Sequence, residues 1–485
     1  MKKKFYNDKQ RHQTIINAQD LPLTQPTTHP LLSVNPAQKT PVASPVTSAP
    51  IMVENPQKNK QEPKITITSK KPKLLIVAHN HPHFFPGGAE IIAYDLFKTM
   101  REQGNLDVFF MGGVSWEDRK VHTGTPFQTI NDKSDEIIFW GADFDYFLQS
   151  QNIKSFMYLD FKLFLEKMQP DIIHFHHTMR IGLEALQIAK QVLPNVKIFY
   201  TLHEYIFICN RDGQMVRTKN NELCSEYAPS RCHQCFPDIS PAEFKMREIF
   251  IKSHLEHVDK FISPSKFLSD RFITWGIPAE KMQVLENGRK VTPPAPFRNL
   301  GKGEKRNVFG YFGQINPYKG ATLALKAAKY LVEQDFTDFR LEIFGNVEMQ
   351  PDEFKKSFFK MIDKYSNNIG FHGKYKNADV PELIKQVDWT IVPSTWWENS
   401  PLVIQEAFMH KRPIIASDIG GMAEKVEDKV TGLHFQARSE ISLARTIKAA
   451  VEDEGLWQKL VDNIGPRLSL EECALEHLKI YNNQA

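Results

Sequence analysis

Short apolar runs alternate along most of the chain with longer segments in which apolar residues recur every three to four positions. The run Lys73–His79 is almost wholly apolar, and residues 88–102 follow it with helical spacing. A second unit of the same kind has a run at 307–313, a loop, and a strongly patterned segment at 321–333. Continuous apolar runs are typical of parallel strands buried on both faces, and amphipathic segments after them are typical of helices. The pattern predicts an α/β protein with parallel sheets.

Length and composition divide the chain into parts. A chain of 485 residues is too long for one ordinary domain and suits two. Between Glu286 and Arg306 the composition turns to Pro, Gly and charged residues, which indicates a linker. We therefore expect a first lobe over 71–297, a second lobe over 298–466 and a terminal helical segment over 467–485.

The first 70 residues differ from the rest of the chain. They hold ten Lys/Arg against four Asp/Glu, a net charge of +6, whereas the remainder carries −2. They also hold nine of the thirty prolines and few aromatic residues. Such a segment buries too little apolar surface to offset its ordering entropy, so we predict that residues 1–70 form a disordered basic tail. Its charge suits weak attraction to an anionic membrane or nucleic acid, but a solvated linker is favoured.

The chain shows no targeting or membrane-spanning pattern. Met-Lys-Lys-Lys at the start is followed by polar residues where a signal peptide needs an apolar stretch. No run of about eighteen apolar residues occurs, as a spanning helix requires. We expect a cytoplasmic protein with at most peripheral contact to the inner membrane face, and no nucleic-acid partner.

The most informative segment runs from Pro393 to Ala407 and contains two glutamates, Glu398 and Glu406. An apolar strand ends at its start, and a helix begins near Ser400, so Glu398 is expected on the loop and Glu406 in the helix. Loops at the carboxyl ends of parallel strands bind ligands in open α/β sheets, and a helix start offers free N–H groups to phosphate. Two carboxylates there can hold a polyhydroxyl ligand; solvated helix-flanking acids are the alternative.

Together with residues 413–424, this segment resembles the donor-sugar segment of the family 4 retaining glycosyltransferases. The resemblance extends from Lys73 to the C-terminus. It implies the GT-B fold, in which two Rossmann-like lobes face a cleft and a terminal helix crosses back to the first lobe. It also implies transfer of a hexose from a nucleotide-diphosphate sugar to an acceptor hydroxyl, with retention at the anomeric carbon and without a catalytic metal or other cofactor. The acceptor would be a glycan, a glycolipid or a small molecule, in cell-surface polysaccharide or glycolipid synthesis.

The resemblance also assigns roles to single residues. Glu398 would lie near the donor sugar and Glu406 at the nucleotide ribose, while His176 would join Glu398 as a candidate catalytic residue beside the transferred sugar. Lys319, just before a helix, is well placed to neutralise a diphosphate leaving group. The candidate donor-binding residues are Gly87, Gly88, Gln314, Lys319, Asn399, Ser400, Pro401, Leu402 and Glu406.

One position departs from the family pattern. Related transferases commonly carry arginine where this chain has Gln314. Glutamine can donate hydrogen bonds to a phosphate but brings no charge. We therefore expect a weaker diphosphate clamp, or one that another residue completes.

Three histidines close the apolar run Pro170–His177. With the period of two that strands have, His174 and His176 share one face, while His177 leaves the strand at its carboxyl end. Hydrogen-bonded core histidines are the structural alternative to a site role. His203 ends the next apolar run in the same way, so we expect it to point into the same cleft.

Four cysteines lie in an insertion over residues 205–240 that is rich in Asn, Asp, Gly and Pro. Cys232 and Cys235 have the two-residue spacing that zinc sites use, and Cys209 and Cys224 would complete a tetrahedral structural zinc site. Because a second pair with this spacing is missing, free cysteines remain the alternative. Disulfides are disfavoured in a reducing cytoplasm.

Two other classes of function fit the same architecture. A sugar-nucleotide epimerase would convert its substrate without a separate acceptor. A phosphorylase would need inorganic phosphate. A non-catalytic sugar-nucleotide binding protein is the third reading, which the joint presence of Lys319, Glu398 and Glu406 disfavours.

Overall fold

The fold is described from a computed structural model, which places residues 71–115, 124–130, 133–141 and 143–483. The prediction for the tail over residues 1–70 lies outside these ranges. No helix in the described ranges is long and apolar enough to cross a membrane.

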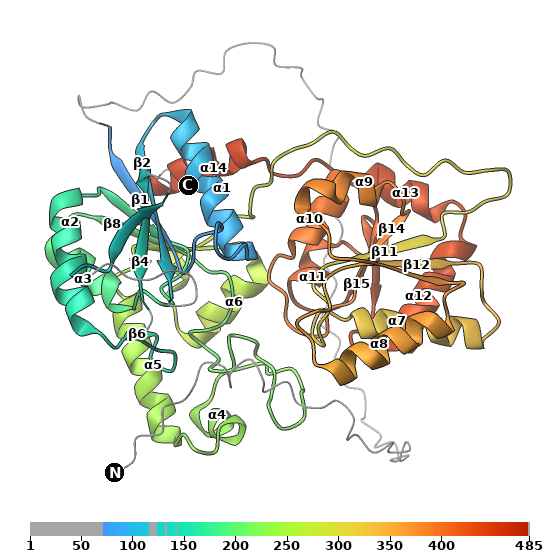
Figure 1. Cartoon of the computed structure of the whole chain (residues 1–485), viewed down its shortest axis with the longest axis horizontal. Coiled ribbons are helices and arrows are strands. Elements are labelled where there is room, and N and C mark those ends of the chain that lie inside the picture. The colour runs from blue at the N-terminus through green and yellow to red at the C-terminus, as the bar shows by residue number, and fades with distance from the viewer. Residues whose placement is uncertain (1–70, 116–123, 131–132, 142, 484–485) are drawn as a thin grey trace, which may run out of the picture. The chain divides into compact units, whose positions relative to one another are not determined.

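The first lobe is built on an eight-stranded sheet with the order β10-β9-β8-β7-β1-β2-β4-β3 (Figure 1). All neighbours in it pair parallel except β3 and β4, which pair antiparallel. Its strands are β1 (Lys73–Ala78), β2 (Asp107–Val114), β3 (Phe127–Ile130), β4 (Lys133–Trp140), β7 (Ile172–Phe175), β8 (Lys197–Thr201), β9 (Lys260–Ser263) and β10 (Met282–Val284). Its helices are α1 (Gly88–Gln103), α2 (Lys162–Met168), α3 (Glu184–Val192), α4 (Pro229–Cys235), α5 (Pro241–Leu255) and α6 (Lys266–Trp275). A small hairpin of β5 (Phe144–Asp145) and β6 (Ser150–Gln151), the π-helix η2 (Phe156–Phe161) and the 3₁₀-helix η3 (Ala279–Lys281) fill the connections.

The second lobe has a six-stranded parallel sheet with the order β13-β12-β11-β14-β15-β16. Its strands are β11 (Val308–Phe312), β12 (Arg340–Phe344), β13 (Ile369–Gly373), β14 (Trp389–Val392), β15 (Ile414–Ser417) and β16 (Gly432–Phe435). Its helices are α7 (Ala321–Glu333), α8 (Asp352–Lys364), the 3₁₀-helix η4 (Asn377–Asp379), α9 (Val380–Ile384), α10 (Leu402–Met409), α11 (Gly420–Lys425), α12 (Glu440–Glu452) and α13 (Leu456–Asn463).

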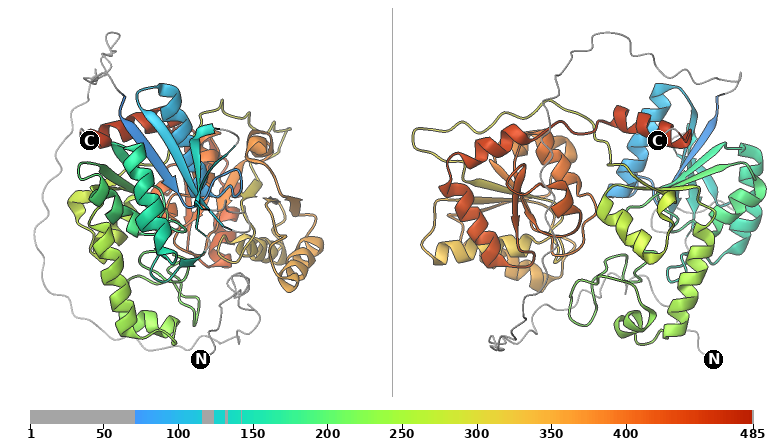
Figure 2. Two further views of the ribbon diagram at one scale, coloured as in Figure 1. Left: turned by 60° about the vertical axis from the view of Figure 1, so that its left-hand side comes forward. Right: turned by 180° about the vertical axis from the view of Figure 1, so that it is seen from behind.

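Alternation along the strands of the second lobe explains why helices cover both faces of its sheet. Tyr311 and Ile391 pack in one apolar cluster with residues of α7, α8, α12 and α13. Their neighbours Phe312 and Val392 pack in another cluster, with residues of α9, α10 and α11. The ribbon views show helices on both sides of this sheet (Figure 2). Strands buried on both faces read as continuous apolar runs, which is the pattern seen in the sequence. The predicted class, two Rossmann-like α/β lobes, is confirmed.

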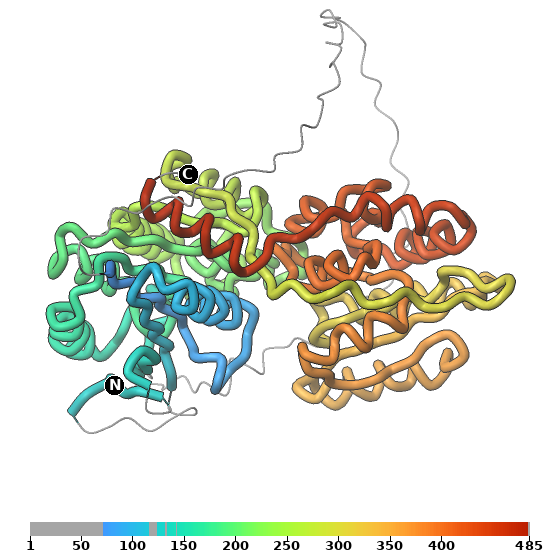
Figure 3. The backbone as a smooth tube through the Cα atoms, turned by 90° about the horizontal axis from the view of Figure 1, so that it is seen from above, coloured from blue at the N-terminus to red at the C-terminus, as the bar shows by residue number. Residues whose placement is uncertain are grey.

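The terminal helix α14 (Leu470–Tyr481) packs on the first lobe rather than the second (Figure 3). Ala474, Leu478 and Tyr481 share an apolar cluster with residues of β1 and α1. The two chain segments that join the lobes pair through a parallel bridge between Arg289 and Ser469. In that bridge the N–H of Arg289 donates to the carbonyl of Leu468 at 3.0 Å.

Candidate active site

Glu398 lies on the loop between β14 and α10, as the sequence indicates. Its Oε1 atom accepts three hydrogen bonds: from Lys319 Nζ at 2.7 Å, from Ser394 Oγ at 2.8 Å and from Trp396 Nε1 at 2.8 Å. Only 7% of the residue is exposed. A buried carboxylate is costly unless it is paired and hydrogen-bonded, and these three donors satisfy that requirement.

Lys319 reaches Glu398 because two loops of the second lobe pack directly against each other. The loop after β11 ends at Gly320, whose φ of +79° is in the left-handed region. A Cβ atom at this position would lie 1.9 Å from the carbonyl oxygen of Pro393, at the end of β14. Only glycine permits this close approach of the two loops, and the approach brings the lysine and the glutamate together.

The loop between β14 and α10, which carries Glu398, is also supported from its other side by the start of α11. The N–H of Gly421 donates to the carbonyl of Glu398 at 2.6 Å. A Cβ atom at Gly421 would lie 1.7 Å from the carbonyl oxygen of Asn399. Gly420 and Gly421 therefore allow the start of α11 to pack closely against the loop that carries Glu398.

Glu406 lies in α10, as expected, and forms an ion pair with Arg289 from the segment that links the lobes. Arg289 could not be selected from sequence patterns, because it lies in a stretch of Pro, Gly and charged residues that indicates only a linker. Gln405, the neighbour of Glu406, donates from Nε2 to the carbonyl of Asn287 at 2.8 Å. Helix α10 is thus tied to the linker at two consecutive positions.

The two glutamates differ in ionisation although they lie close in sequence. Burial by itself would raise the pKa of Glu398, but the charge of Lys319 and the hydrogen bonds outweigh it and lower that pKa. Burial raises the pKa of Glu406, and Arg289 offsets the effect only in part. Glu398 is therefore a firmly ionised carboxylate, whereas Glu406 takes up a proton more readily than an ordinary glutamate.

The start of α10 presents polar atoms that have no partner. Asn399 Nδ2 donates to the carbonyl of His203 in the first lobe at 2.6 Å. The Oδ1 atom of Asn399 and the Oγ atom of Ser400 are buried without a hydrogen-bond partner among the described residues. Pro401 precedes the first helical residue, Leu402, so the first N–H groups of the helix point out of its start. This cluster offers hydrogen bonds to an anionic or polyhydroxyl ligand.

The structure also brings the loop before α1 to the start of α10. A Cβ atom at Gly88 would lie 4.0 Å from Leu402 Cδ1. Gly87 is the N-cap of α1 and has an extended backbone. The candidate residues Gly87 and Gly88 of the first lobe and Leu402 of the second therefore lie side by side.

Gln314 does not join this group. It is exposed, and its side chain has no hydrogen-bond partner in the part of the chain that the structure describes. Its carbonyl accepts a hydrogen bond from the Tyr311 hydroxyl at 2.7 Å. The side chain is therefore unrestrained by the protein, and its role toward a phosphate stays a prediction.

In the first lobe, β7 ends at Phe175, so His176 follows the strand instead of lying within it. His176 Nδ1 lies 3.0 Å from His203 Nε2, and its Nε2 atom is buried without a partner among the described residues. His174 is held at both ring nitrogens, by the Tyr481 hydroxyl and by Thr201 Oγ1, each at 2.7 Å. His174 is thus a structural residue that ties α14 to β7, whereas His176 keeps one ring nitrogen available.

These histidines are neutral. Burial lowers the pKa of His174 and that of His176 well below the usual value, with neighbouring histidines adding to the effect. Burial lowers the pKa of His203 to about 3. The unpartnered nitrogen of His176 belongs to a neutral imidazole, which can donate or accept a hydrogen bond according to its tautomer.

Two histidine–carboxylate pairs next to this group were not selected from the sequence. His177 Nε2 lies 3.1 Å from Glu204 Oε1, and His79 Nε2 lies 2.9 Å from Glu90 Oε1. The rings of His79 and His177 have centroids 4.4 Å apart. A usable signal existed, since His79, His177 and Glu204 each follow an apolar run.

The pocket beside His176 is formed with the linker and α14. Its other polar lining residues are Thr201, Asn287, Cys473 and His477. Cys473 is buried there. His203 links His176 to the loop after β14, because its ring lies 3.0 Å from that of His176 and its carbonyl accepts from Asn399 Nδ2.

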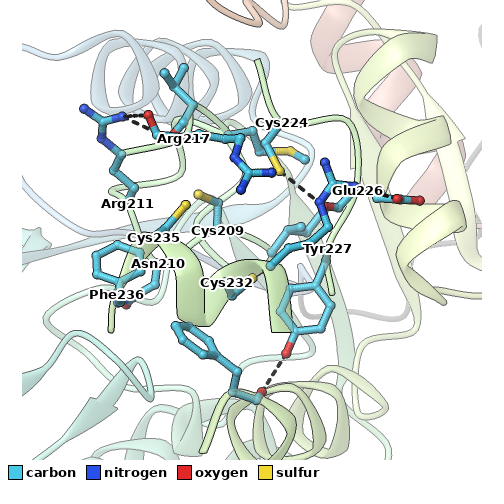
Figure 4. Close-up of a pocket in the computed structure, with 15 residues that line it drawn as sticks. Cys209, Asn210, Arg211, Arg217, Cys224, Glu226, Tyr227, Cys232, Cys235 and Phe236 are labelled. Carbon is cyan, nitrogen blue, oxygen red and sulfur yellow. Dashed lines mark hydrogen bonds and ion pairs between the residues drawn. The ribbon is translucent and has the colours of Figure 1, made fainter. Parts of the chain in front are cut away.

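The four cysteines of the insertion line one pocket, together with three arginines and several apolar residues (Figure 4). All four are free thiols. Within the described ranges, no three His, Cys, Asp or Glu side chains are grouped so that they could hold a metal ion, and structural zinc stays a prediction. Burial raises the pKa of Cys209 to about 11 and that of Cys232 to about 12, so neither is a reactive thiolate at neutral pH.

Two family models match the chain. Residues 86–292 match the model described as Glycosyltransferase Family 4, and residues 294–465 match the model described as Glycosyl transferases group 1. Together these matches cover both lobes and almost all of the described residues. The chain belongs to the family 4 glycosyltransferases with the GT-B fold.

The curated relatives share less than a third of their aligned residues with this chain. The chain is 24% identical over 302 residues to the UDP-Gal:alpha-D-GlcNAc-diphosphoundecaprenol alpha-1,3-galactosyltransferase of Escherichia coli. The aligned residues make up 60% of this chain and 69% of that protein. It is 29% identical over 206 residues to the lipopolysaccharide 1,2-N-acetylglucosaminetransferase of Salmonella typhimurium, which covers 40% of this chain and 54% of the relative.

Solved structures share the fold. The sucrose-phosphate synthase of Thermosynechococcus elongatus matches with a TM-score of 0.59 and 18% identity, over 85% of this chain and 99% of that one. The Anabaena protein HepE in complex with UDP matches with a TM-score of 0.58 and 17% identity, over 85% of this chain and all of that one. At these identities the matches establish the two-lobe architecture.

Proposed function

We propose that the protein transfers a sugar from a nucleotide-diphosphate sugar to an acceptor hydroxyl, with retention at the anomeric carbon. The observation that carries the proposal is the convergence of Lys319 and Glu398 beside the start of α10, where Asn399 and Ser400 present unpartnered polar atoms. Such a group combines a cation, an ionised carboxylate and free N–H groups at the carboxyl ends of two strands. This combination suits a ligand that is both anionic and rich in hydroxyls.

Each residue then has a distinct role. Lys319 and the N–H groups of α10 stabilise the negative charge that develops on the departing diphosphate. Glu398 accepts hydrogen bonds from sugar hydroxyls, and Glu406 accepts them from the ribose. His176, neutral and with one ring nitrogen available, binds a hydroxyl of the sugar or the acceptor. None of these steps needs a metal ion, because Lys319 supplies the positive charge.

We further propose a UDP-sugar as the donor and a lipid-linked saccharide as the acceptor. Support comes from the activities of the two relatives, one of which uses UDP-Gal and a diphosphoundecaprenol acceptor while the other acts on lipopolysaccharide. The protein would act at the cytoplasmic face of the membrane that carries such lipids, in contact with it only at its periphery.

A direct test begins with a thermal-shift panel of nucleotide diphosphates, since a ligand that binds only the folded state raises the melting temperature. The full chain is then incubated with the matching nucleotide sugars, with and without a lipid-linked saccharide, and without added divalent metal ions. We expect nucleotide diphosphate to be released only with the acceptor, and NMR of the product to show the donor's anomeric configuration.

Other results would select a rival function. Conversion of the sugar nucleotide without an acceptor would indicate an epimerase, and turnover that depends on inorganic phosphate would indicate a phosphorylase. Binding without any turnover would indicate a non-catalytic protein. An inverted anomeric centre would leave glycosyl transfer standing and would contradict retention.

A further inference from the structure

The segment from Cys209 to Cys235 is a separate candidate site within the first lobe. It has almost no regular structure: one isolated bridge joins Val216 and Leu223, and the short helix α4 ends the segment. None of the residues in α4 is buried. A stretch of this kind does not build a core of its own. Met215 is buried in the apolar cluster of the first lobe, and Cys209 and Cys224 pack against that cluster.

Four thiols from three places in this segment line one pocket (Figure 4). Cys209 precedes the bridge, Cys224 follows it, and Cys232 and Cys235 lie one turn apart on α4. None of the four is in a disulfide. Four soft sulfur ligands around one space are the donor set of a closed tetrahedral zinc site.

A buried positive charge next to the segment lacks a carboxylate partner. Arg247 of α5 is fully buried and donates to the carbonyls of Phe147, Phe207 and Ile206 at 2.7, 2.7 and 2.6 Å. No carboxylate lies within ion-pair distance of it among the described residues. A buried cation is costly unless a negative charge offsets it.

We propose that Cys209, Cys224, Cys232 and Cys235 bind one zinc ion as a closed structural site. Four thiolates and one Zn²⁺ carry a net charge of −2, which Arg247 and the arginines that line the pocket offset. The thiols surround the pocket without three of them being close enough to share an ion, so binding tightens the irregular turns between them. Metal binding and local folding are therefore one event in this segment.

The segment also contacts the proposed donor loops, which gives zinc a second consequence. Arg211 Nη2 donates to the Tyr318 hydroxyl at 3.0 Å, next to Lys319. Trp397 Nε1 donates to the carbonyl of Cys224 at 3.0 Å, next to Glu398. The zinc site thus steadies the loops on both sides of the Lys319–Glu398 pair, and this part of the inference rests on the proposed function.

Metal content tests the site without any reference to activity. The full chain, purified without a metal-affinity tag under reducing conditions, should contain about one zinc per chain. The double variant Cys232→Ser, Cys235→Ser should lose the zinc. Cys473→Ser should keep the zinc, because Cys473 does not line the four-cysteine pocket. Cobalt substituted for zinc should show the intense visible bands of tetrahedral thiolate coordination.

Three results would overturn the site. These are a wild-type protein that stays metal-free after anaerobic reconstitution with zinc, a double variant that keeps its full metal content, and a thiol titration showing that the four cysteines are paired as disulfides. Trypsin gives a further readout, because Arg217, Lys219 and Arg231 lie inside the segment. Zinc should slow cleavage at these residues several-fold, and equal rates with and without zinc would contradict a structural role.

The link to the donor loops is measured separately, by calorimetric titration with UDP. Zinc-loaded protein should bind UDP several-fold more tightly than protein from which zinc has been removed. Equal affinities would overturn the link while the metal measurement stands. Failure of both forms to bind any nucleotide diphosphate would count against the proposed function and not against the zinc site.

Discussion

The two sides of the proposed site use opposite electrostatics. On the second-lobe side, Glu398 is buried as an ionised carboxylate, and Lys319 lies 2.7 Å away. On the first-lobe side, His174 and His176 are buried and His203 is partly buried, all as neutral rings that hydrogen-bond to hydroxyls and to one another. Burial therefore accompanies a charged group in one lobe and uncharged groups in the other.

The difference follows from what each group has as a neighbour. A buried carboxylate keeps its charge only where a cation and several donors offset the loss of water. A buried imidazole loses its charge where its neighbours are other imidazoles and hydroxyls, because a second positive charge would be repelled. The charged side suits a diphosphate that carries negative charge, and the neutral side suits hydroxyl groups. The predictions below break or sharpen this contrast, beginning with the largest effect.

Replacing Lys319 should have the largest consequence. Lys319→Ala removes the one cation on Glu398, and turnover should fall about 100- to 1,000-fold, as when one preorganised donor to a developing negative charge is lost. Steady-state kinetics measures this. Lys329→Ala, at a lysine on α7 that pairs only with Glu333, is the matched control and should keep full turnover.

Loss of Lys319 also leaves Glu398 buried without its cation, so a fall in turnover alone is ambiguous. The double variant Lys319→Ala, Glu398→Gln removes the unpaired charge and should recover thermal stability but not turnover. Wild-type turnover in a folded Lys319→Ala protein would exclude Lys319 from the leaving-group side.

Glu406→Ala should weaken nucleotide binding. It removes charge-assisted hydrogen bonds to the ribose worth about 1.5–3 kcal/mol, about 10- to 150-fold in affinity. Calorimetric titration with the nucleotide diphosphate chosen by thermal shift measures the loss. Glu406→Gln keeps the shape of the side chain and should lose less. If affinity is unchanged in a folded Glu406→Ala variant, the ion pair with Arg289 is the whole role of Glu406.

The neutral histidines of the first-lobe side and of α14 should make the free energy of unfolding depend on pH. Unfolded histidines bind protons near pH 6.5, while burial holds the pKa of His203 at about 3 and that of His477 at about 4. The unfolded state thus binds more protons, and the free energy of unfolding should fall as pH drops from 6.5 toward 4. Each such histidine contributes about 1.4 kcal/mol per pH unit.

Urea unfolding across this pH range measures the slope. His477→Gln should reduce this slope by the contribution of one histidine. A slope that does not respond to His477→Gln would show that this ring is protonated in the folded protein.

The smallest expected effect concerns Gln314. Because the side chain is exposed, Gln314→Arg should strengthen nucleotide diphosphate binding by only about 0.2–1 kcal/mol, the value of an exposed ion pair. The gain should shrink as salt rises. In the double variant with Lys319→Ala, partial rescue of binding would place both side chains at one phosphate, and additive effects would place them apart.

Much of the architecture could be predicted from local pattern. The apolar runs at 73–79 and 307–313 became β1 and β11, and the helix expected over 321–333 is α7 with the same bounds. Strand ends were less predictable, since the histidine-bearing strand stops at Phe175. His176 is still buried, and its N–H still donates to the carbonyl of Val77 in β1 at 2.7 Å, although the strand ends one residue before it. Periodicity reports burial, which continues past the end of a strand.

The sequence by itself determined the α/β class, the loop position of Glu398 and the helical position of Glu406, because apolar period and helix-start signals are local. Only the tertiary structure decided which charges meet. Lys319 and Glu398 are 79 positions apart, and Arg289 and Glu406 are 117 positions apart. The opposite pKa shifts of the two glutamates follow from these long-range partners and from burial, which depend on how the loops pack. No local pattern in the sequence shows that the pKa of Glu398 is lowered while that of Glu406 is raised.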